Sequence, residues 1–257
     1  MPTVRVATRS TAHAARANVS VNRRSAPQVD FVIYLRGLWL LLRHPAIIVV
    51  PLLAALVSVL LSQVGQFFTD PLGGAGGGLI SFLQNIVFGF AFGVATIYAN
   101  DLQRGYKTNF DSVWDEAVGK AGAILMATVG FIFVISVAAM VGSLLGSIGF
   151  YTLLIVAAFF LIYTIPAGAI SGLQGPLAVS ASIRAVREHP ASAFLLAIVF
   201  VLLWGVLPQL TSFEMQTMTT NPLLFQVIQA VVQALVFGYL AFPFAKNYDD
   251  VAPRGFL

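Results

Sequence analysis

Two histidines stand directly before prolines, each at the start of a long apolar segment, and they are the first residues to consider for chemistry. His44 and Pro45 precede one such segment, and His189 and Pro190 precede another. An imidazole can bind a metal ion or titrate near neutral pH. A zinc site, however, needs three or four protein ligands. The corresponding segment before the third apolar run of the chain has no histidine. We therefore interpret both histidines as hydrogen-bonding residues at a membrane interface and expect no cofactor.

Ser171 is the candidate nucleophile, because the sequence AISG (169–172) resembles the nucleophile segment of membrane serine proteases. A serine must be activated by a neighbouring base, and no His or Lys falls within the long apolar runs. Those runs also lack Asp, Glu and Arg, and such charges usually mark ion pathways and proton relays. The chain has no cysteine, which excludes disulfides and thiolate sites. The sequence thus predicts a protein that is neither an enzyme nor an ion pump.

Glutamine and serine supply most of the polar side chains within the apolar runs, and several of them share one helix face. They are Ser58, Ser62, Gln63 and Gln66 in the first run, Gln84 and Asn85 in the second, and Gln226, Gln229 and Gln233 in the last. An amide in hydrocarbon needs a hydrogen-bond partner. These residues therefore either join helices to one another or line a polar cavity for a neutral or headgroup-like ligand. Interlocked amides would favour the first alternative, and a void between them the second.

The apolar runs have the length of membrane-spanning helices. Only 9% of the 257 residues are charged and 58% are apolar, whereas a soluble domain carries about 25% charged residues. A spanning helix needs about 20 apolar residues, and the sequence has six such runs: 46–67, 78–99, 121–145, 149–172, 191–212 and 222–244. We predict an all-α integral membrane protein of six transmembrane helices in three hairpins. The Gly-rich segment 69–78 is predicted to be a flexible connector between the first two.

Basic residues predict the orientation in the membrane. All 14 Lys and Arg residues lie in the N-terminal segment, in the second-to-third and fourth-to-fifth connections, or in the C-terminal tail. The three opposite connections, 68–77, 146–148 and 213–221, have none. Because positively charged loops stay in the cytoplasm, we predict that both termini are cytoplasmic. The expected location is a bacterial inner membrane.

The chain contains similar segments, both at the hairpin ends and at the steps that precede hairpins. The stretch 84–101 aligns with 233–250 without gaps, and the two His-Pro steps correspond. We interpret the chain as one membrane domain, 28–250, of three pseudo-repeats, about 28–101, 108–173 and 176–250. Each is predicted to start with an amphipathic cytoplasmic helix at the lipid interface, which a proline ends before the next helix begins. The residues expected at anionic headgroups are Arg36, Trp39, Arg43, His44, Trp114, Lys120, Arg184, Arg187 and His189.

Small residues and prolines predict how the spans pack. The pairs Gly89–Gly93, Gly142–Gly146 and Gly168–Gly172 have the G-x-x-x-G spacing, which lets two helix backbones approach closely. Pro166 and Pro243 fall inside the fourth and sixth runs and are predicted to kink them.

The N-terminal arm of the chain is polar. Residues 1–27 are rich in Arg, Ser, Thr and Ala and contain no acidic residue. This composition fits an organellar transit peptide and also a flexible cytoplasmic arm that touches anionic lipid, of which we favour the arm. Residues 251–257 are predicted to be a cytoplasmic tail.

The stretch 165–203, IPAGAISGLQGPLAVSASIRAVREHPASAFLLAIVFVLL, resembles a loose superfamily of six-span membrane proteins. This superfamily includes the membrane domain of glycerophosphodiester phosphodiesterases and related integral membrane proteins of unknown function. Gly175, Pro176, Ala178, Ser182 and Arg184 carry the resemblance. It implies a kinked fourth helix followed by an amphipathic helix. The sequence has no phosphodiesterase domain beside it, so the resemblance implies the fold and no hydrolysis.

Together these features favour a non-catalytic membrane protein, an accessory or scaffolding subunit of a membrane complex. The alternative is a small permease or lipid-handling protein that uses the Gln and Ser faces. We expect membrane lipids and other membrane subunits as partners, and no nucleic acid.

Overall fold

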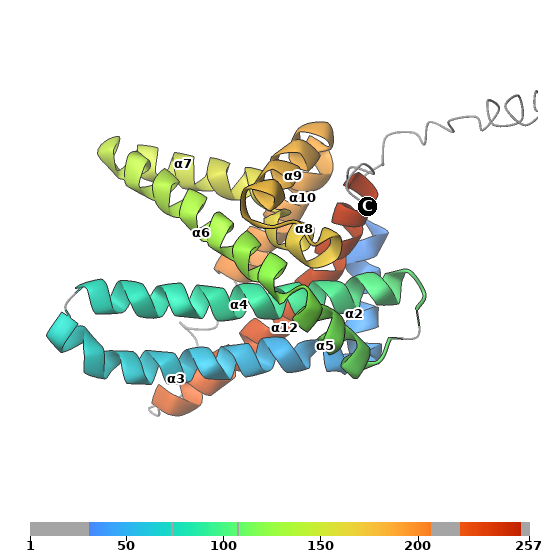
Figure 1. Cartoon of the computed structure of the whole chain (residues 1–257), viewed down its shortest axis with the longest axis horizontal. Coiled ribbons are helices and arrows are strands. Elements are labelled where there is room, and N and C mark those ends of the chain that lie inside the picture. The colour runs from blue at the N-terminus through green and yellow to red at the C-terminus, as the bar shows by residue number, and fades with distance from the viewer. Residues whose placement is uncertain (1–30, 73, 107, 207–221, 253–257) are drawn as a thin grey trace, which may run out of the picture.

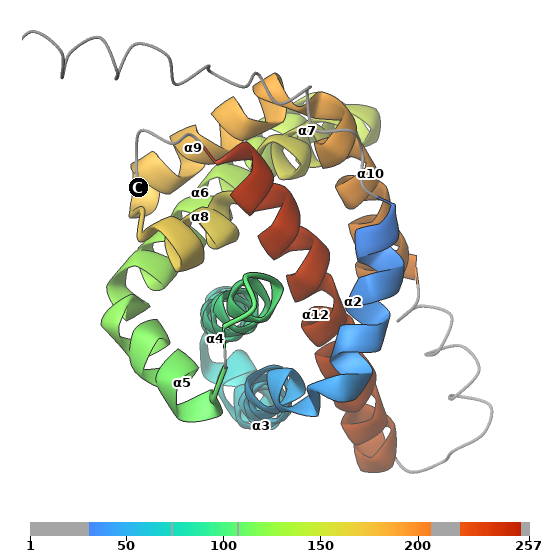
Figure 2. The same ribbon diagram turned by 90° about the vertical axis from the view of Figure 1, so that its right-hand side faces the viewer.

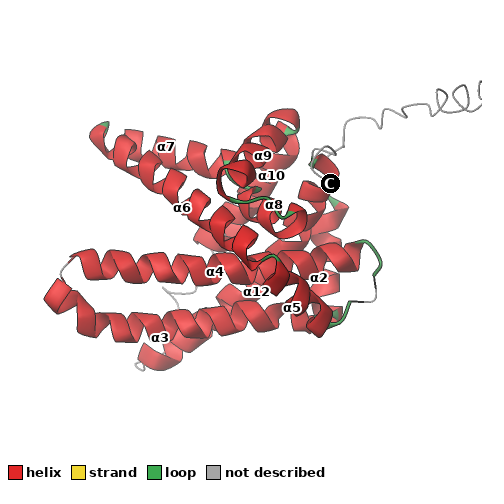
Figure 3. Cartoon of the chain, in the orientation of Figure 1, coloured by secondary structure: helices red, strands yellow, loops and turns green. Residues whose placement is uncertain are grey.

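The computed structural model describes residues 31–72, 74–106, 108–206 and 222–252, and it is helical throughout these ranges, without a β-strand (Figure 3). The elements are α2 (Val32–Arg43), η1 (Pro45–Ile48), α3 (Val49–Leu72), α4 (Gly74–Gln103), α5 (Phe110–Gly119), α6 (Ala121–Leu144), α7 (Gly146–Phe160), α8 (Thr164–Ser171), α9 (Gly175–Glu188), α10 (Pro190–Phe200), η2 (Val201–Val206) and α12 (Pro222–Val251). The all-helical prediction is confirmed. The arm 1–27 and the tail residues 253–257 lie outside the described residues.

Within the described residues, five helical segments are long and apolar enough to cross a membrane, so this is an integral membrane protein. They are Pro45–Gly65, Gly77–Gln103, Ala121–Leu144, Gly146–Ser171 and Leu224–Val251. The number rises to six if α9 and α10, which meet at a bend of 111°, count as one broken span. The fifth predicted run, 191–212, is described up to Val206.

The helices differ from the predicted runs at two places. The segment 69–78 is not a flexible connector, because α3 continues to Leu72 and α4 begins at Gly74. Glycine costs about 1 kcal/mol in a helix, but backbone groups in lipid must be hydrogen-bonded, which favours the helix. The fourth span is interrupted between Phe160 and Thr164, and Pro166 lies after this break, inside α8. Pro243 lies inside the continuous α12, and the kink predicted there stays a prediction.

The hairpins α3–α4 and α6–α7 diverge from the region where α4 packs on α6, and α12 packs along both α3 and α4 (Figure 1). The short helices α2, α5 and α9 lie around the end of α4 (Figure 2). A short helix followed by two longer segments occurs three times in the described order. The pseudo-repeat boundaries stay a prediction.

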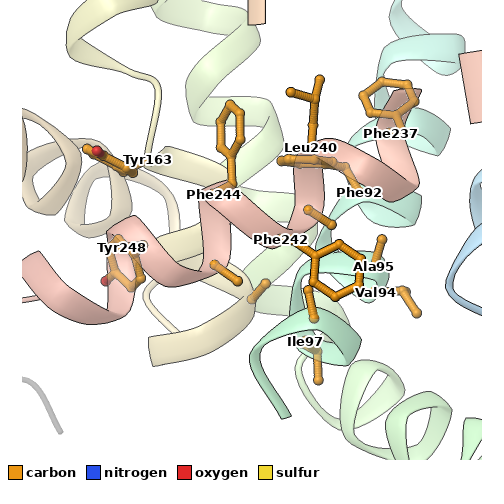
Figure 4. Close-up of a cluster of buried hydrophobic side chains, with 14 of the residues drawn as sticks. Phe92, Val94, Ala95, Ile97, Tyr163, Phe237, Leu240, Phe242, Phe244 and Tyr248 are labelled. Carbon is orange, nitrogen blue, oxygen red and sulfur yellow. The ribbon is translucent and has the colours of Figure 1, made fainter. Parts of the chain in front are cut away.

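The core lies where α4, α8 and α12 meet. Figure 4 shows Phe92 of α4 beside Phe237 and Phe244 of α12, with Tyr163 and Tyr248 nearby. All five side chains are buried. Many other large apolar side chains face outward instead, as expected for helices whose surroundings are lipid tails.

Candidate functional site

The two His-Pro steps have the same backbone geometry. The φ and ψ angles are −126° and 66° at His44 and −134° and 61° at His189. Each histidine N–H closes the preceding helix, by donating to Leu40 O at 2.9 Å and to Ala185 O at 3.0 Å respectively. A proline then opens the next helix. The prediction that these steps are elbows between two helices is confirmed, and their place at a membrane interface stays a prediction.

The polar faces of the spans interlock. Gln63 Nε2 of α3 donates to Gln226 Oε1 of α12 at 2.9 Å. Gln84 Nε2 of α4 donates to Ser62 Oγ at 2.8 Å and to the carbonyl oxygen of Ser58 at 3.0 Å. These bonds hold α3 to both of its neighbours, which is the arrangement expected of amides that join helices.

The remaining amides of the predicted set have different surroundings where the structure describes them. Asn85 is exposed, and its amide donates to the Ser81 carbonyl of its own helix at 2.8 Å. Gln229 and Gln233 are half-buried on α12. Gln66 belongs to α3, but its side chain lies outside the described part of the chain.

The three glycine pairs play different roles. Gly89 and Gly93 both press α4 against α6, since a Cβ there would lie 2.3 Å from Thr128 Cγ2 and 2.6 Å from Ile124 Cγ2. In the other pairs one glycine packs and the other turns the chain. Gly142 faces the Phe150 backbone and Gly168 faces α6, whereas Gly146 and Gly172 have φ angles of +79° and +67° and open space around them. Glycine adopts positive φ far more readily than any other residue.

The basic and aromatic residues of the short helices are mostly exposed. Arg36, Trp39, Arg43, Trp114, Arg184 and Arg187 are exposed, and His44 and His189 are half-buried. The Arg43 guanidinium carbon lies 3.7 Å from the centre of the Trp39 ring, a cation–π contact. Lys120 instead pairs with Glu116 at 2.7 Å and donates to the Ile170 carbonyl at 3.0 Å. It thus bonds the last turn of α8, where a cation is favourable.

Sequence reasoning missed several polar contacts between helices at the end of the bundle that carries the short helices. Arg104 pairs with Asp249, and this hydrogen bond raises the pKa of the guanidinium, which stays charged. Gln103 Nε2 donates to the Phe242 carbonyl beside Pro243 at 2.9 Å. The Ser171 and Tyr248 hydroxyls are 2.9 Å apart. The partners are distant in sequence, so no local pattern could have revealed them.

A large apolar groove, which sequence reasoning also missed, lies between α4, α6, α7, α10 and α12. Its volume is about 840 Å³. Phe92, Phe237 and Phe244 are buried at its floor, whereas Ile155, Phe194 and Val201 line it and are largely exposed. The groove is therefore open along the side of the bundle, within the membrane-spanning part of these helices.

The groove offers a ligand almost no polar group. Asn85 and Thr128 are the two polar residues of its wall. Each makes a hydrogen bond within its own helix, because Thr128 donates to the Ile124 carbonyl at 2.9 Å and Asn85 to that of Ser81. The groove is suited to a hydrocarbon and to no charged or strongly polar molecule.

Within the described residues, no three His, Asp or Glu side chains come together as metal ligands would. Of the predicted polar set, the groove wall includes Asn85 alone, and of the predicted packing glycines it includes Gly89. The predicted site residues therefore form helix contacts and an exposed end of the bundle, and the groove is a separate feature.

Comparisons with protein-family models, with curated proteins and with solved structures found no match. The resemblance of 165–203 to the glycerophosphodiester phosphodiesterase membrane domain stays a prediction. What the chain shows is a multi-span helical membrane protein.

Proposed function

We propose that this protein is a non-catalytic, lipid-handling membrane protein that binds an acyl chain of a membrane lipid in the lateral groove. The observation that supports this proposal is the groove itself, about 840 Å³ in volume, with buried phenylalanines at its floor and exposed apolar residues at its rim. Sites for small ligands are typically about 300–1,000 Å³ and mostly apolar. An acyl chain can enter from the bilayer without crossing water.

The size of the groove favours a slender chain over a helix of another protein. A helix is about 10 Å across, so 840 Å³ would hold roughly a 10 Å length of it, about seven residues. A spanning helix is about 30 Å long. An acyl chain has a much smaller cross-section and can follow the groove between α7 and α10.

The proposed orientation places α2, α5 and α9 at the cytoplasmic interface of a bacterial inner membrane, each before one of three hairpins. Exposed Arg36, Arg43, Arg184 and Arg187 support contact with anionic headgroups. The bend of 111° between α9 and α10 would let α9 lie nearly flat on a membrane that α10 crosses.

The first prediction tests the groove by cross-linking. A phosphatidylcholine with a photoactivatable diazirine on one acyl chain is mixed into vesicles with the purified full chain, and labelled residues are mapped by mass spectrometry. We expect more label at 154–162 and 194–202 than on the exposed residues of α6 that lie outside the groove. Ala197 lines the groove, so Ala197→Phe should reduce this label by about tenfold, the equivalent of 1.4 kcal/mol.

The matched control is Ala138→Phe, which makes the same change on α6 at a residue outside the groove wall. It should leave the label at 154–162 unchanged. Uniform label over all exposed faces, unaffected by Ala197→Phe, would show that the protein merely has surrounding lipid and binds no chain in the groove.

A second candidate, the accessory or scaffolding subunit, is favoured by the outer face of α6. Met126, Phe133, Val137, Met140 and Leu144 are exposed there at spacings of three, four and seven residues, and methionine adapts to varied partner surfaces. Only 17% of the most apolar stretch of this span is buried, compared with 56% for the last span. The hydrogen bonds of Gln63 and Gln84 also hold α3, α4 and α12 together, as a scaffolding subunit requires.

The second prediction separates the two candidates. The tagged full chain is purified from native membranes in mild detergent, with a photo-cross-linking amino acid in place of Phe133. A scaffolding subunit should retain a partner at about one to one after size exclusion, cross-linked through α6. A chain that elutes alone and cross-links to lipid would overturn the scaffolding candidate.

A further inference from the structure

The break in the fourth span is held by one side chain from another helix. In a continuous α-helix, the Phe160 carbonyl would accept from the N–H of Thr164, and the Tyr163 N–H would donate to Phe159. Here the Thr164 N–H donates to Leu161 at 2.9 Å instead. Both lost partners must be replaced, because an unpaired backbone group in hydrocarbon is costly.

Ser182 of α9 replaces both of them. Its hydroxyl donates to the Phe160 carbonyl oxygen at 2.8 Å and accepts from the Tyr163 N–H at 3.0 Å. Ser182 is fully buried, and Ala178 and Ala185, one turn away on either side, are buried as well. The single hydroxyl oxygen of Ser182 thus supplies both hydrogen-bond partners that the interrupted backbone lacks.

This break forms one wall of the groove. Phe159, Phe160, Leu161 and Ile162 all line it, together with Ile165. Phe159 and Phe160 precede the break and Ile165 follows it. A return of 160–163 to regular helix geometry, with 3.6 residues to each turn, would rotate the residues on one side of the break relative to those on the other. The shape of this wall therefore depends on the break.

We propose that Ser182 is the positioning residue that sets the shape of this wall and so determines which chains the groove accepts. The inference rests on the proposed lipid-binding function. Without the Ser182 hydroxyl, residues 160–163 gain by returning to regular helix geometry, which rotates part of the wall away from the groove. Loss of the Ser182 hydroxyl should therefore change which acyl-chain lengths bind more than it changes the unfolding free energy of the bundle.

The test, which is the third prediction, uses Ser182→Ala, with Ser180→Ala as its matched control. The Ser180 hydroxyl is exposed and bonds the Leu177 carbonyl of its own helix at 2.9 Å. Saturated fatty acids of increasing length compete with the diazirine phosphatidylcholine for the full chain in vesicles. In Ser182→Ala, loss of two hydrogen bonds should reduce the label at 159–165 by about tenfold. Competition by the fatty acids should also depend less on their chain length. Ser180→Ala should change neither the label nor the competition.

Hydrogen exchange gives a second readout at the Tyr163 amide, which donates to the Ser182 hydroxyl. In Ser182→Ala this amide should stay protected, because a regular helix gives it the Phe159 carbonyl as acceptor. Faster exchange would show that the break persists without Ser182 and would contradict the proposed rotation of the wall. If that variant does not fold, Ser182→Cys takes its place, since a thiol is a much weaker hydrogen-bond partner. An unchanged label pattern and length preference in the variants would overturn the role of Ser182. Absence of groove label in the unmodified protein would instead overturn the proposed function.

Discussion

Replacing Gly89 and Gly93 together by alanine is expected to destabilise the bundle by roughly 2–6 kcal/mol, from about 1–3 kcal/mol for each overpacked site. The new methyl groups would lie 2.3 Å from Thr128 Cγ2 and 2.6 Å from Ile124 Cγ2. These two partners are one turn apart and buried, so α6 must move away from α4 as a whole. Close backbone approach is a principal source of stability between helices in lipid.

The unfolding free energy of the purified protein in mixed micelles, titrated with SDS and followed by circular dichroism, measures this loss. Gly122→Ala on α6 is the matched control, because a Cβ there meets nothing within 4 Å. It should be neutral or stabilise the helix by about 0.5–1 kcal/mol. A Gly89→Ala/Gly93→Ala protein as stable as the Gly122→Ala protein would contradict the close contact of α4 with α6.

The same glycines show what spacing can predict and what it cannot. All three G-x-x-x-G pairs were equivalent as sequence, yet in two of them one glycine adopts positive φ at the end of a helix. Whether a glycine packs or turns depends on where its helix ends. The end of α8 at Gly172 depends in turn on contacts with distant helices, including the bond from Lys120 to Ile170.

Features set by local chemistry were predictable. Long apolar runs indicated the membrane spans, because bilayer thickness fixes the length of such helices. The His-Pro steps indicated the elbows, because proline restricts the residue before it and suits the first turn of a helix. In both elbows the histidine indeed ends one helix and the proline starts the next.

Features set by distant contacts were not predictable. The break at 161–163 contains neither glycine nor proline, and the serine that holds it lies on α9. The groove gave no signal either, because a phenylalanine that lines it and one that faces lipid are alike in sequence. Phe92 is 5% exposed and Phe133 is 67% exposed, although both belong to long apolar runs.

This difference gives the last prediction. Phe92→Ala should destabilise the protein by about 3 kcal/mol, the lower end of the range for removing a buried aromatic side chain. The Phe92 ring centre lies 5.5 Å from that of Phe237 and 5.1 Å, edge to face, from that of Phe244. Lipid tails are as apolar as the core, so the loss comes from these van der Waals contacts and not from exposure to water.

Phe133→Ala is the control, because that ring is in contact with lipid or detergent whether or not the helices are packed. Its unfolding free energy should stay within about 0.5 kcal/mol of the unmodified protein. An equal loss in both variants would mean that Phe92 is no better packed than an outward-facing ring.

The same variant connects stability to the groove. Phe92→Ala enlarges the groove floor, and a bound chain can take the place of the missing ring. A ligand at 100 times its Kd stabilises the folded state by about 2.7 kcal/mol, so saturating phosphatidylcholine in the micelles should recover most of the loss at Phe92→Ala. It should recover nothing when Ala197→Phe is added, because that ring closes the groove. Equal recovery with and without Ala197→Phe would place the lipid effect elsewhere on the bundle.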